Sequence, residues 1–282
     1  VKTFWHWIDY LAQESAAAGK SPCFINLDET SLPRFMKRPA GFIAPRRLWL
    51  GKLAPRRPLP KGQRRGAVTH VAMIANLERV QPKLPQIFLC NERVVPAWAL
   101  KSSDLCKPNT VEFWREKSGW NNVAKMKRIL EKIAGAMVEF ADLQPIVLLD
   151  CAPCHIHPEV AAVAEELGLW LAVTPAKLTF LLQPLDVFAF SPYKSCLAKL
   201  FAAREKPDGE LGVAEWMQCL CDAARKFWCS RKWRPAFELT GILSTRQALS
   251  LELQHLNVSR HAAAPLLPPS QESVEAIFPK GK

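Results

Sequence analysis

Residues 147–155 read Val147-Leu148-Leu149-Asp150-Cys151-Ala152-Pro153-Cys154-His155. Three consecutive apolar residues lead directly into an aspartate, and a proline-bearing turn follows. An uninterrupted apolar run of this kind predicts a buried strand, and α/β proteins place their reactive side chains at the carboxyl ends of such strands. The stretch therefore predicts an α/β fold in which Asp150 lies at the C-terminal edge of a sheet.

Two further acids stand in comparable settings. Asp28 follows the run Phe24-Ile25-Asn26-Leu27, and Asp186 follows Leu181-Leu182-Gln183-Pro184-Leu185. In an α/β sheet, carboxylates at strand ends or on an adjoining helix can converge. We therefore expect Asp28, Asp150 and Asp186 to belong to one site.

The remaining chain supplies the elements of such a sheet. Strands are predicted at about 23–27, 67–76, 85–90, 145–149 and 169–173, and helices at 1–20, 123–140, 158–167, 210–228 and 249–256. Residues 94–100 are expected to extend the sheet, residues 101–120 to be irregular, and Asp186 to begin a helix. This order predicts a mixed sheet with parallel crossovers, flanked by helices.

The positive charge of the chain is concentrated in one segment. The 282 residues carry a net charge of +12, and residues 31–66 contain eleven Lys and Arg, no acid and six prolines. Prolines disfavour a helix, and a one-signed block of charge more often marks an interaction segment than a solvated loop. We expect this segment to bind nucleic-acid phosphates. The residues assigned to that contact are Arg46, Arg47, Arg56, Arg57, Lys61, Arg64 and Arg65.

The composition also bears on the cellular setting. No apolar run approaches the ~18 residues of a membrane span, and no secretory leader is recognisable. Nine cysteines without paired spacing argue against a disulfide framework. These features predict a protein of a reducing intracellular compartment with no membrane partner.

Three motifs resemble the DDE superfamily of transposases, and in particular its pogo/Tigger branch. They are Leu27-Asp28-Glu29-Thr30, Leu148-Leu149-Asp150-x-Ala152-Pro153-x-His155 and Leu181-Leu182-Gln183-Pro184-Leu185-Asp186-Val187. Asp150 and Asp186 are separated by 35 residues, which suits this branch. An aspartate as the third acid distinguishes it from the typical mariner pattern. Lesser matches extend the resemblance over residues 21–243.

The resemblance implies a ribonuclease-H-like DDE catalytic domain. The implied organisation is a lead-in helix (1–20), the catalytic domain (21–202) with its inserted basic loop (31–66), a C-terminal helical extension (203–246) and a tail (247–282). Asp28, Asp150 and Asp186 would hold two Mg²⁺ or Mn²⁺ ions, since converging carboxylates repel one another and all-oxygen ligands suit these ions.

The activity implied by the resemblance is DNA phosphodiester hydrolysis followed by strand transfer, which is a reaction of DNA recombination in the nucleus. A homodimer on the DNA is left open. The alternative is a domesticated or degenerate descendant that binds nucleic acid without catalysis, and a metal nuclease acting on RNA shares the same acids.

Several residues near the acids have rival interpretations. His155 is expected to support the active-site loop by hydrogen bonding. Cys151 stands where relatives often carry Asn, which is expected to loosen the hydrogen bonding around Asp150. Phe188 replaces a usual Gly and is expected to crowd a close backbone approach. Glu29 is an alternative ligand to Asp28, but adjacent strand residues face opposite ways and the motif favours Asp28.

Cysteine, histidine and tryptophan residues offer further alternatives. Cys151, Cys154, His155 and His157 suggest a zinc site, although buried thiols beside a turn histidine explain them as well. Trp49, inside the basic segment, is the best candidate for stacking on bases. The tryptophans expected in the core are Trp7, Trp98, Trp170, Trp216 and Trp228.

Overall fold

The computed structural model describes residues 1–34, 67–102, 104–204, 211–243, 249–256 and 268. The seven Lys and Arg residues predicted to bind nucleic acid, and Trp49, lie outside these ranges.

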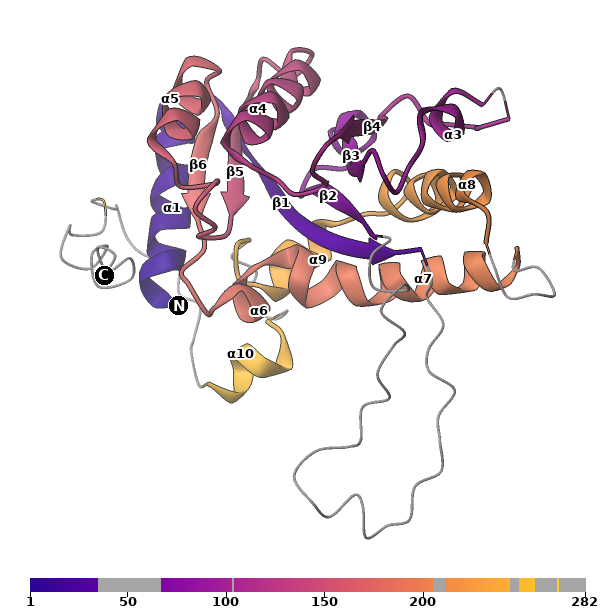
Figure 1. The fold of residues 1–282 in the computed structure, drawn as a ribbon. Coiled ribbons are helices and arrows are strands. Elements are labelled where there is room, and N and C mark those ends of the chain that lie inside the picture. The colour runs from indigo at the N-terminus through magenta and orange to yellow at the C-terminus, as the bar shows by residue number, and fades with distance from the viewer. Residues whose placement is uncertain (35–66, 103, 205–210, 244–248, 257–267, 269–282) are drawn as a thin grey trace, which may run out of the picture.

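Six strands form one mixed sheet in the order β4-β3-β2-β1-β5-β6 (Figure 1). The strands are β1 (Ser21–Pro33), β2 (Ala67–Ala75), β3 (Gln86–Asn91), β4 (Val111–Glu116), β5 (Leu143–Leu149) and β6 (Trp170–Val173). β2 runs antiparallel to β1 and β3, whereas the other neighbouring strands are parallel. The apolar runs thus form the strands that were predicted from them.

Helices cover both faces of this sheet. The helical elements are α1 (Lys2–Ala17), η2 (Gln81–Lys83), α3 (Ala97–Lys101), α4 (Val123–Met137), α5 (Pro158–Glu166), α6 (Thr179–Leu182), η3 (Leu185–Ala189), α7 (Phe190–Ala202), α8 (Val213–Ala223), η4 (Ala224–Trp228), α9 (Arg234–Leu239) and α10 (Leu251–His255). Buried side chains of α4 and α5 pack on one face, and those of α1, α7, α8 and α9 pack on the other. A mixed sheet covered in this way is the predicted α/β, ribonuclease-H-like architecture.

The alternation of side chains along β1 assigns its residues to the two faces. Phe24 and Leu32 belong to the buried cluster shared with α1, α7 and α8. Ile25 and Leu27 belong to the cluster shared with α4 and α5. The even-numbered side chains of β1 therefore face α7, and the odd-numbered ones face α4 and α5.

Capping residues and glycines mark several of the helix boundaries. Asn122 caps α4, and its side chain accepts a hydrogen bond of 2.9 Å from the backbone N–H of Lys125. Gly19 and Gly168, which follow α1 and α5, have φ values of +73° and +66°, a conformation that glycine adopts without strain. None of the described helices has the length and hydropathy that crossing a membrane requires.

For the sheet, the sequence-based assignment fails in three places. β1 continues past Asp28 to Pro33, because antiparallel pairing with β2 extends the strand after its pairing with β5 has ended. Residues 94–100 do not extend the sheet, and 97–100 lie in helix α3. The segment 101–120, expected to be irregular, contains the edge strand β4, which pairs in parallel with β3.

The tryptophans divide between the core and the surface. Trp216 and Trp228 are fully buried, as predicted, and Trp7 and Trp170 are partly buried. The prediction for Trp98 is wrong, since its side chain in α3 is 61% exposed.

Helices α8 and α9 share the buried cluster of α7 and the sheet. The domain boundary expected at residue 202 stays a prediction.

Candidate active site

The register between β1 and β5 brings two of the three aspartates together. Asn26 pairs with Leu148 in the last parallel pair of these strands. Continuing the same register by two residues places Asp28 level with Asp150, which directly follows the end of β5. The two aspartates, far apart in sequence, thus lie side by side, with Asp28 within β1 and Asp150 just after the end of β5.

Asn26 ties the segment before the third aspartate to the same strands. Its Oδ1 accepts a hydrogen bond of 2.8 Å from the backbone N–H of Leu185, and its Nδ2 donates to the carbonyl of Leu148 at 3.2 Å. Asn26 is completely buried, so this amide satisfies backbone groups that water does not reach. It thereby fixes η3, which carries Asp186, against β1 and β5.

Gln183 makes a second link between the same segments. In the amide orientation that satisfies both of its ends, Nε2 donates to Asp28 Oδ2 at 3.2 Å and Oε1 accepts from the backbone N–H of Asp150 at 3.2 Å. The other carboxylate oxygen of Asp28 accepts from the backbone N–H of Glu29 at 2.8 Å. Gln183 therefore holds Asp28 and Asp150 in a fixed relation.

The carboxylates of this end of the sheet oppose one another's ionisation. Burial, followed by the charges of Asp186, Glu29 and Asp150, raises the pKa of Asp28 well above its usual range. Burial and the charge of Asp150 raise the pKa of Asp186, although a hydrogen bond from Thr179 acts in the other direction. A bound cation would relieve this repulsion, so the chemistry of these three oxygen-donating side chains fits a divalent metal.

Asp150 is held by a buried histidine. His155 is 1% exposed; its Nδ1 lies 2.5 Å from Asp150 Oδ1, and its Nε2 lies 3.1 Å from Glu29 Oε1. Burial alone would lower the pKa of His155, but hydrogen bonds with Asp150, Cys154 and Glu29 raise it to about 12. Burial disfavours the Asp150 anion, yet the hydrogen bonds from His155 and the backbone N–H of Ala152 lower the pKa of this carboxyl. Both ring nitrogens of His155 therefore face carboxylate oxygens, an arrangement that stabilises the protonated imidazole.

Asn121 extends this hydrogen-bonded chain toward α4. Its Nδ2 donates to Glu29 Oε1 at 2.5 Å. The loop that carries it is fixed by the buried Lys125, whose Nζ donates to the carbonyls of Ser118 at 2.7 Å and Trp120 at 2.8 Å. The α4 face thus supports Asp150 through Asn121, Glu29 and His155, while Asn26 and Gln183 act from the α7 face.

The aspartates interact electrostatically without forming a ready-made coordination sphere. Within the described ranges, no three His, Cys, Asp or Glu side chains are grouped so that they hold one ion as they stand. The hydrogen bond between Asp150 Oδ1 and His155 is one physical reason, because it directs that oxygen toward the histidine. Charges shift one another's pKa values over longer distances than a metal–oxygen bond spans. The raised pKa values of Asp28 and Asp186 are therefore compatible with side chains that are not yet grouped around one ion.

Two expectations about neighbouring residues are wrong. Cys151 does not loosen the contacts of Asp150, because its Sγ donates to the carbonyl of Thr174 at 3.1 Å while Asp150 is held by its own partners. The ring of Phe188 is 36% exposed and lies edge-on to Trp233, with 6.5 Å between the ring centroids. It therefore lies on the surface instead of in a tight backbone contact.

The chain matches solved structures, but no family model and no curated protein matches it. The chain is similar to structures of Mos1 transposase. The Mos1 paired-end complex with the left transposon end is 14% identical, with a TM-score of 0.34. The mariner paired-end complex with Mn is 17% identical (TM-score 0.36), and the strand transfer complex is 16% identical (TM-score 0.37).

These matches cover 84% of this chain. They cover 62%, 61% and 60% of the three Mos1 chains, so this chain spans about three-fifths of their length.

Sequence reasoning found the aspartates but missed most of the residues that hold them. Glu29 was considered only as a less favoured alternative ligand, and its contact with His155 was not predicted. Asn26 offered a signal, since a polar side chain inside an apolar strand must find hydrogen-bond partners when it is buried. Gln183 and Asn121 lie in loops, where the sequence gives no indication of what they contact.

Proposed function

We propose that this chain is the catalytic domain of a pogo/Tigger-like DDE transposase, a metal-dependent enzyme that cleaves DNA phosphodiesters and transfers strands. One observation carries the proposal: Asp28 is buried close to Asp186 and Asp150, and burial together with their charges raises its pKa well above its usual range. Burial of mutually repelling carboxylates is costly unless the site is used to bind a cation.

Asp28, Asp150 and Asp186 would hold Mg²⁺ or Mn²⁺, in the two-ion arrangement that such reactions use. When bound, these ions activate the attacking water or 3′-hydroxyl and stabilise the leaving oxygen. The protein contributes the placement of the carboxylates. Gln183 and the backbone N–H of Glu29 hold Asp28, and His155 with the backbone N–H of Ala152 holds Asp150.

In this proposal Glu29, His155 and Asn121 are positioning residues. His155 is buried and donates to carboxylates on both sides, so it fixes the direction of the Asp150 carboxylate. Glu29 orients His155, and Asn121 orients Glu29. Groups that orient a metal ligand in this way commonly affect metal affinity and rate without touching the substrate.

DNA is the proposed partner, and the basic segment 31–66 is the proposed site of phosphate contact. Eleven cations and no acid occur in it. The segment begins on β1, whose last residue, Pro33, lies about 16 Å along the strand from Asp28. A nuclear location and a homodimer on DNA belong to the same proposal.

The second candidate is a transposase-derived protein that binds nucleic acid without catalysis. The observation that favours it is the ion pair between His155 and Asp150, because it engages an oxygen that a metal ion would need.

A nicking assay on supercoiled DNA with Mg²⁺ or Mn²⁺ tests these alternatives. We expect nicking by the wild-type protein, loss of nicking in Asp150→Asn, and unchanged nicking in Glu131→Gln, an exposed acid of α4. DNA binding that needs no metal, together with the absence of nicking by any of the three proteins, would support the second candidate. Circular dichroism checks that the Asp150 variant is folded.

A further inference from the structure

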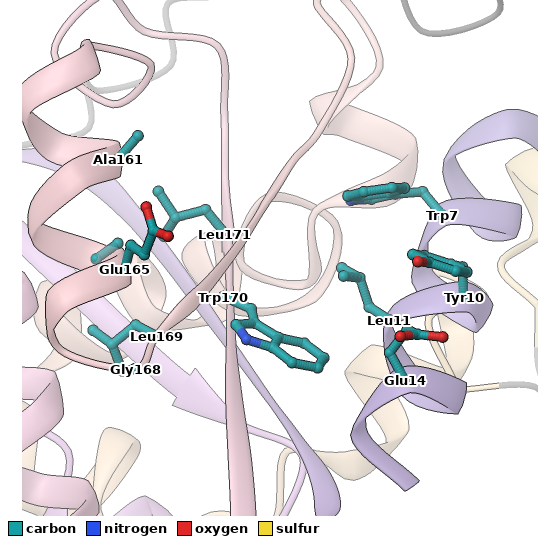
Figure 2. Close-up of a pocket in the computed structure, with 11 residues that line it drawn as sticks. Trp7, Tyr10, Leu11, Glu14, Ala161, Glu165, Gly168, Leu169, Trp170 and Leu171 are labelled. Carbon is teal, nitrogen blue, oxygen red and sulfur yellow. The ribbon is translucent and has the colours of Figure 1, made fainter. Parts of the chain in front are cut away.

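A groove runs along the outer edge of β6, away from the aspartates. Its volume is about 720 Å³, and it is lined by residues of α1 on one side and of α5 and β6 on the other. Figure 2 shows β6 between the two walls, with Trp7, Tyr10 and Glu14 of α1 facing Ala161 and Glu165 of α5 across Trp170 and Leu171. The groove is therefore the place where helices from the two faces of the sheet leave its edge uncovered.

The floor of the groove is the edge strand itself. Among the described strands, β6 is last in the sheet and pairs with β5 alone. An edge strand of this kind presents backbone N–H and C=O groups that another extended segment can pair with, and proteins usually cover or charge such edges. The four residues of β6 span about 13 Å, which is enough for a short extended segment.

The walls of the groove favour an occupant that carries both apolar and basic side chains. Trp7 and Tyr10 stack with 5.6 Å between ring centroids, and the partly buried Trp170 supplies a third aromatic surface. Glu14 and Glu165 are exposed on opposite walls, and none of the described residues lining the groove is basic, although the chain carries +12. Two carboxylates disfavour a nucleic-acid occupant and favour lysine or arginine.

We propose that this groove binds an extended segment of a partner protein, which adds to β6 as a seventh strand and places lysine or arginine between Glu14 and Glu165. Main-chain hydrogen bonds to β6 supply affinity, and the aromatic walls take the apolar side chains of alternate residues. A second copy of this chain is disfavoured, because edge-to-edge pairing of two β6 strands would bring like-charged acids together. The groove is separate from the carboxylates, so this inference stands apart from the proposed catalysis.

The test uses the whole chain and a fluorescein-labelled peptide of alternating valine and lysine, about eight residues long. We expect saturable binding by fluorescence anisotropy, weakened about tenfold or more by the double change Glu14→Lys and Glu165→Lys. Glu131→Lys, an exposed acid of α4 outside the groove, is the matched control and is expected to bind as the wild type does.

Two further peptides separate strand addition from simple charge attraction. The same peptide with N-methylated alternate residues keeps its charge but loses the donors needed for pairing, and it is expected not to bind. A valine–glutamate peptide is also expected not to bind. Equal binding of the lysine and N-methylated peptides, or binding unaffected by the double change, would overturn the proposal. So would concentration-dependent dimerisation that the double change abolishes, since the occupant would then be a second copy.

Discussion

The adjacent residues Asp28 and Glu29 of β1 have different roles at the carboxylate site. Asp28 faces η3 and belongs to the aspartate cluster, whereas Glu29 faces α4 and holds His155. The aspartates themselves could be predicted, because each follows an apolar run. Their supports could not, because the contact between Glu29 and His155 depends on a register and a loop path that no local pattern specifies. The orientation of Glu29 disfavoured it as a ligand, and the same orientation directs it to His155.

Removing the charge of Glu29 tests its positioning role. Glu29→Gln keeps the side chain's size but weakens its hold on His155, so the Asp150 carboxylate loses part of its orientation. We expect DNA cleavage to fall about 10- to 100-fold, with DNA affinity unchanged. Single-turnover cleavage and filter binding measure the two quantities. Glu131→Gln, at an exposed acid of α4, is the control. Wild-type cleavage by Glu29→Gln would contradict the role.

Asn26 offers a second test, through stability. Asn26→Leu removes the amide and leaves the backbone N–H of Leu185 and the carbonyl of Leu148 buried without this partner. We expect the free energy of unfolding to fall by about 2–4 kcal/mol, measured by urea denaturation. The same change at Asn91, which lies near the surface at the end of β3, should cost much less. A similar loss of unfolding free energy at both positions would show that the buried amide of Asn26 has no specific stabilising role.

The elements that the sequence predicted well are those with a single strong pattern. Apolar runs located β2, β3, β5 and β6, and the helices α1, α4 and α5 lie within their predicted ranges. β4 was missed because the side chains on its α4 face are charged or aromatic and do not form an apolar run. Helix α4 covers these side chains, and the Arg128 guanidinium lies 4.2 Å from the Trp114 ring centre. Packing against a neighbouring helix stabilises that strand, and a local reading cannot foresee such a contact.

Gly168 and Gly135 allow a matched comparison of the effect of alanine at a helix end and within a helix. Gly168 ends α5 with φ of +66°, and Gly135 lies inside α4; a Cβ added at either position meets no atom within 4 Å. Gly168→Ala should therefore cost about 1 kcal/mol from backbone strain alone. Gly135→Ala should stabilise the protein by about 0.5–1 kcal/mol, because alanine is the better helix former. Thermal unfolding should show a lower stability for Gly168→Ala and a higher stability for Gly135→Ala. Stability changes of the same sign in both variants would contradict this prediction.

At the scale of the whole molecule, an aromatic cluster joins the sheet to the helices of the α7 face. His70 of β2 lies in it without solvent contact, stacked on Phe88 with 4.2 Å between ring centroids and bonded to Gln86 at 3.1 Å. Tyr193 of α7 and Trp228 of η4 also contact the imidazole. The sequence indicated which of these segments are apolar, but not that α7, α8 and η4 would all cover one face.

This buried histidine makes stability depend on pH. Burial lowers the pKa of His70 from 6.5 to about 3. Between these values the unfolded chain binds a proton that the folded protein does not, so stability from this residue is full above pH 6.5 and is lost as the pH falls toward 3. The slope is at most about 1.4 kcal/mol per pH unit. Urea denaturation at several pH values should show a shallower slope for His70→Leu than for the wild type, whereas the exposed His255→Gln should leave it unchanged. An unaltered slope in His70→Leu would show that His70 is not the source.

The alternation of side chains along β1 limits which insertions and deletions the gene can tolerate. Inserting or deleting one codon between residues 21 and 28 would turn every later side chain of the strand to the opposite face. Asp28 and Glu29 would then exchange faces, and a length change before residue 26 would also turn Asn26 away from Leu185. We therefore expect that, in any working descendant, length changes will be found outside this stretch, and that substitutions will be the only variation within it.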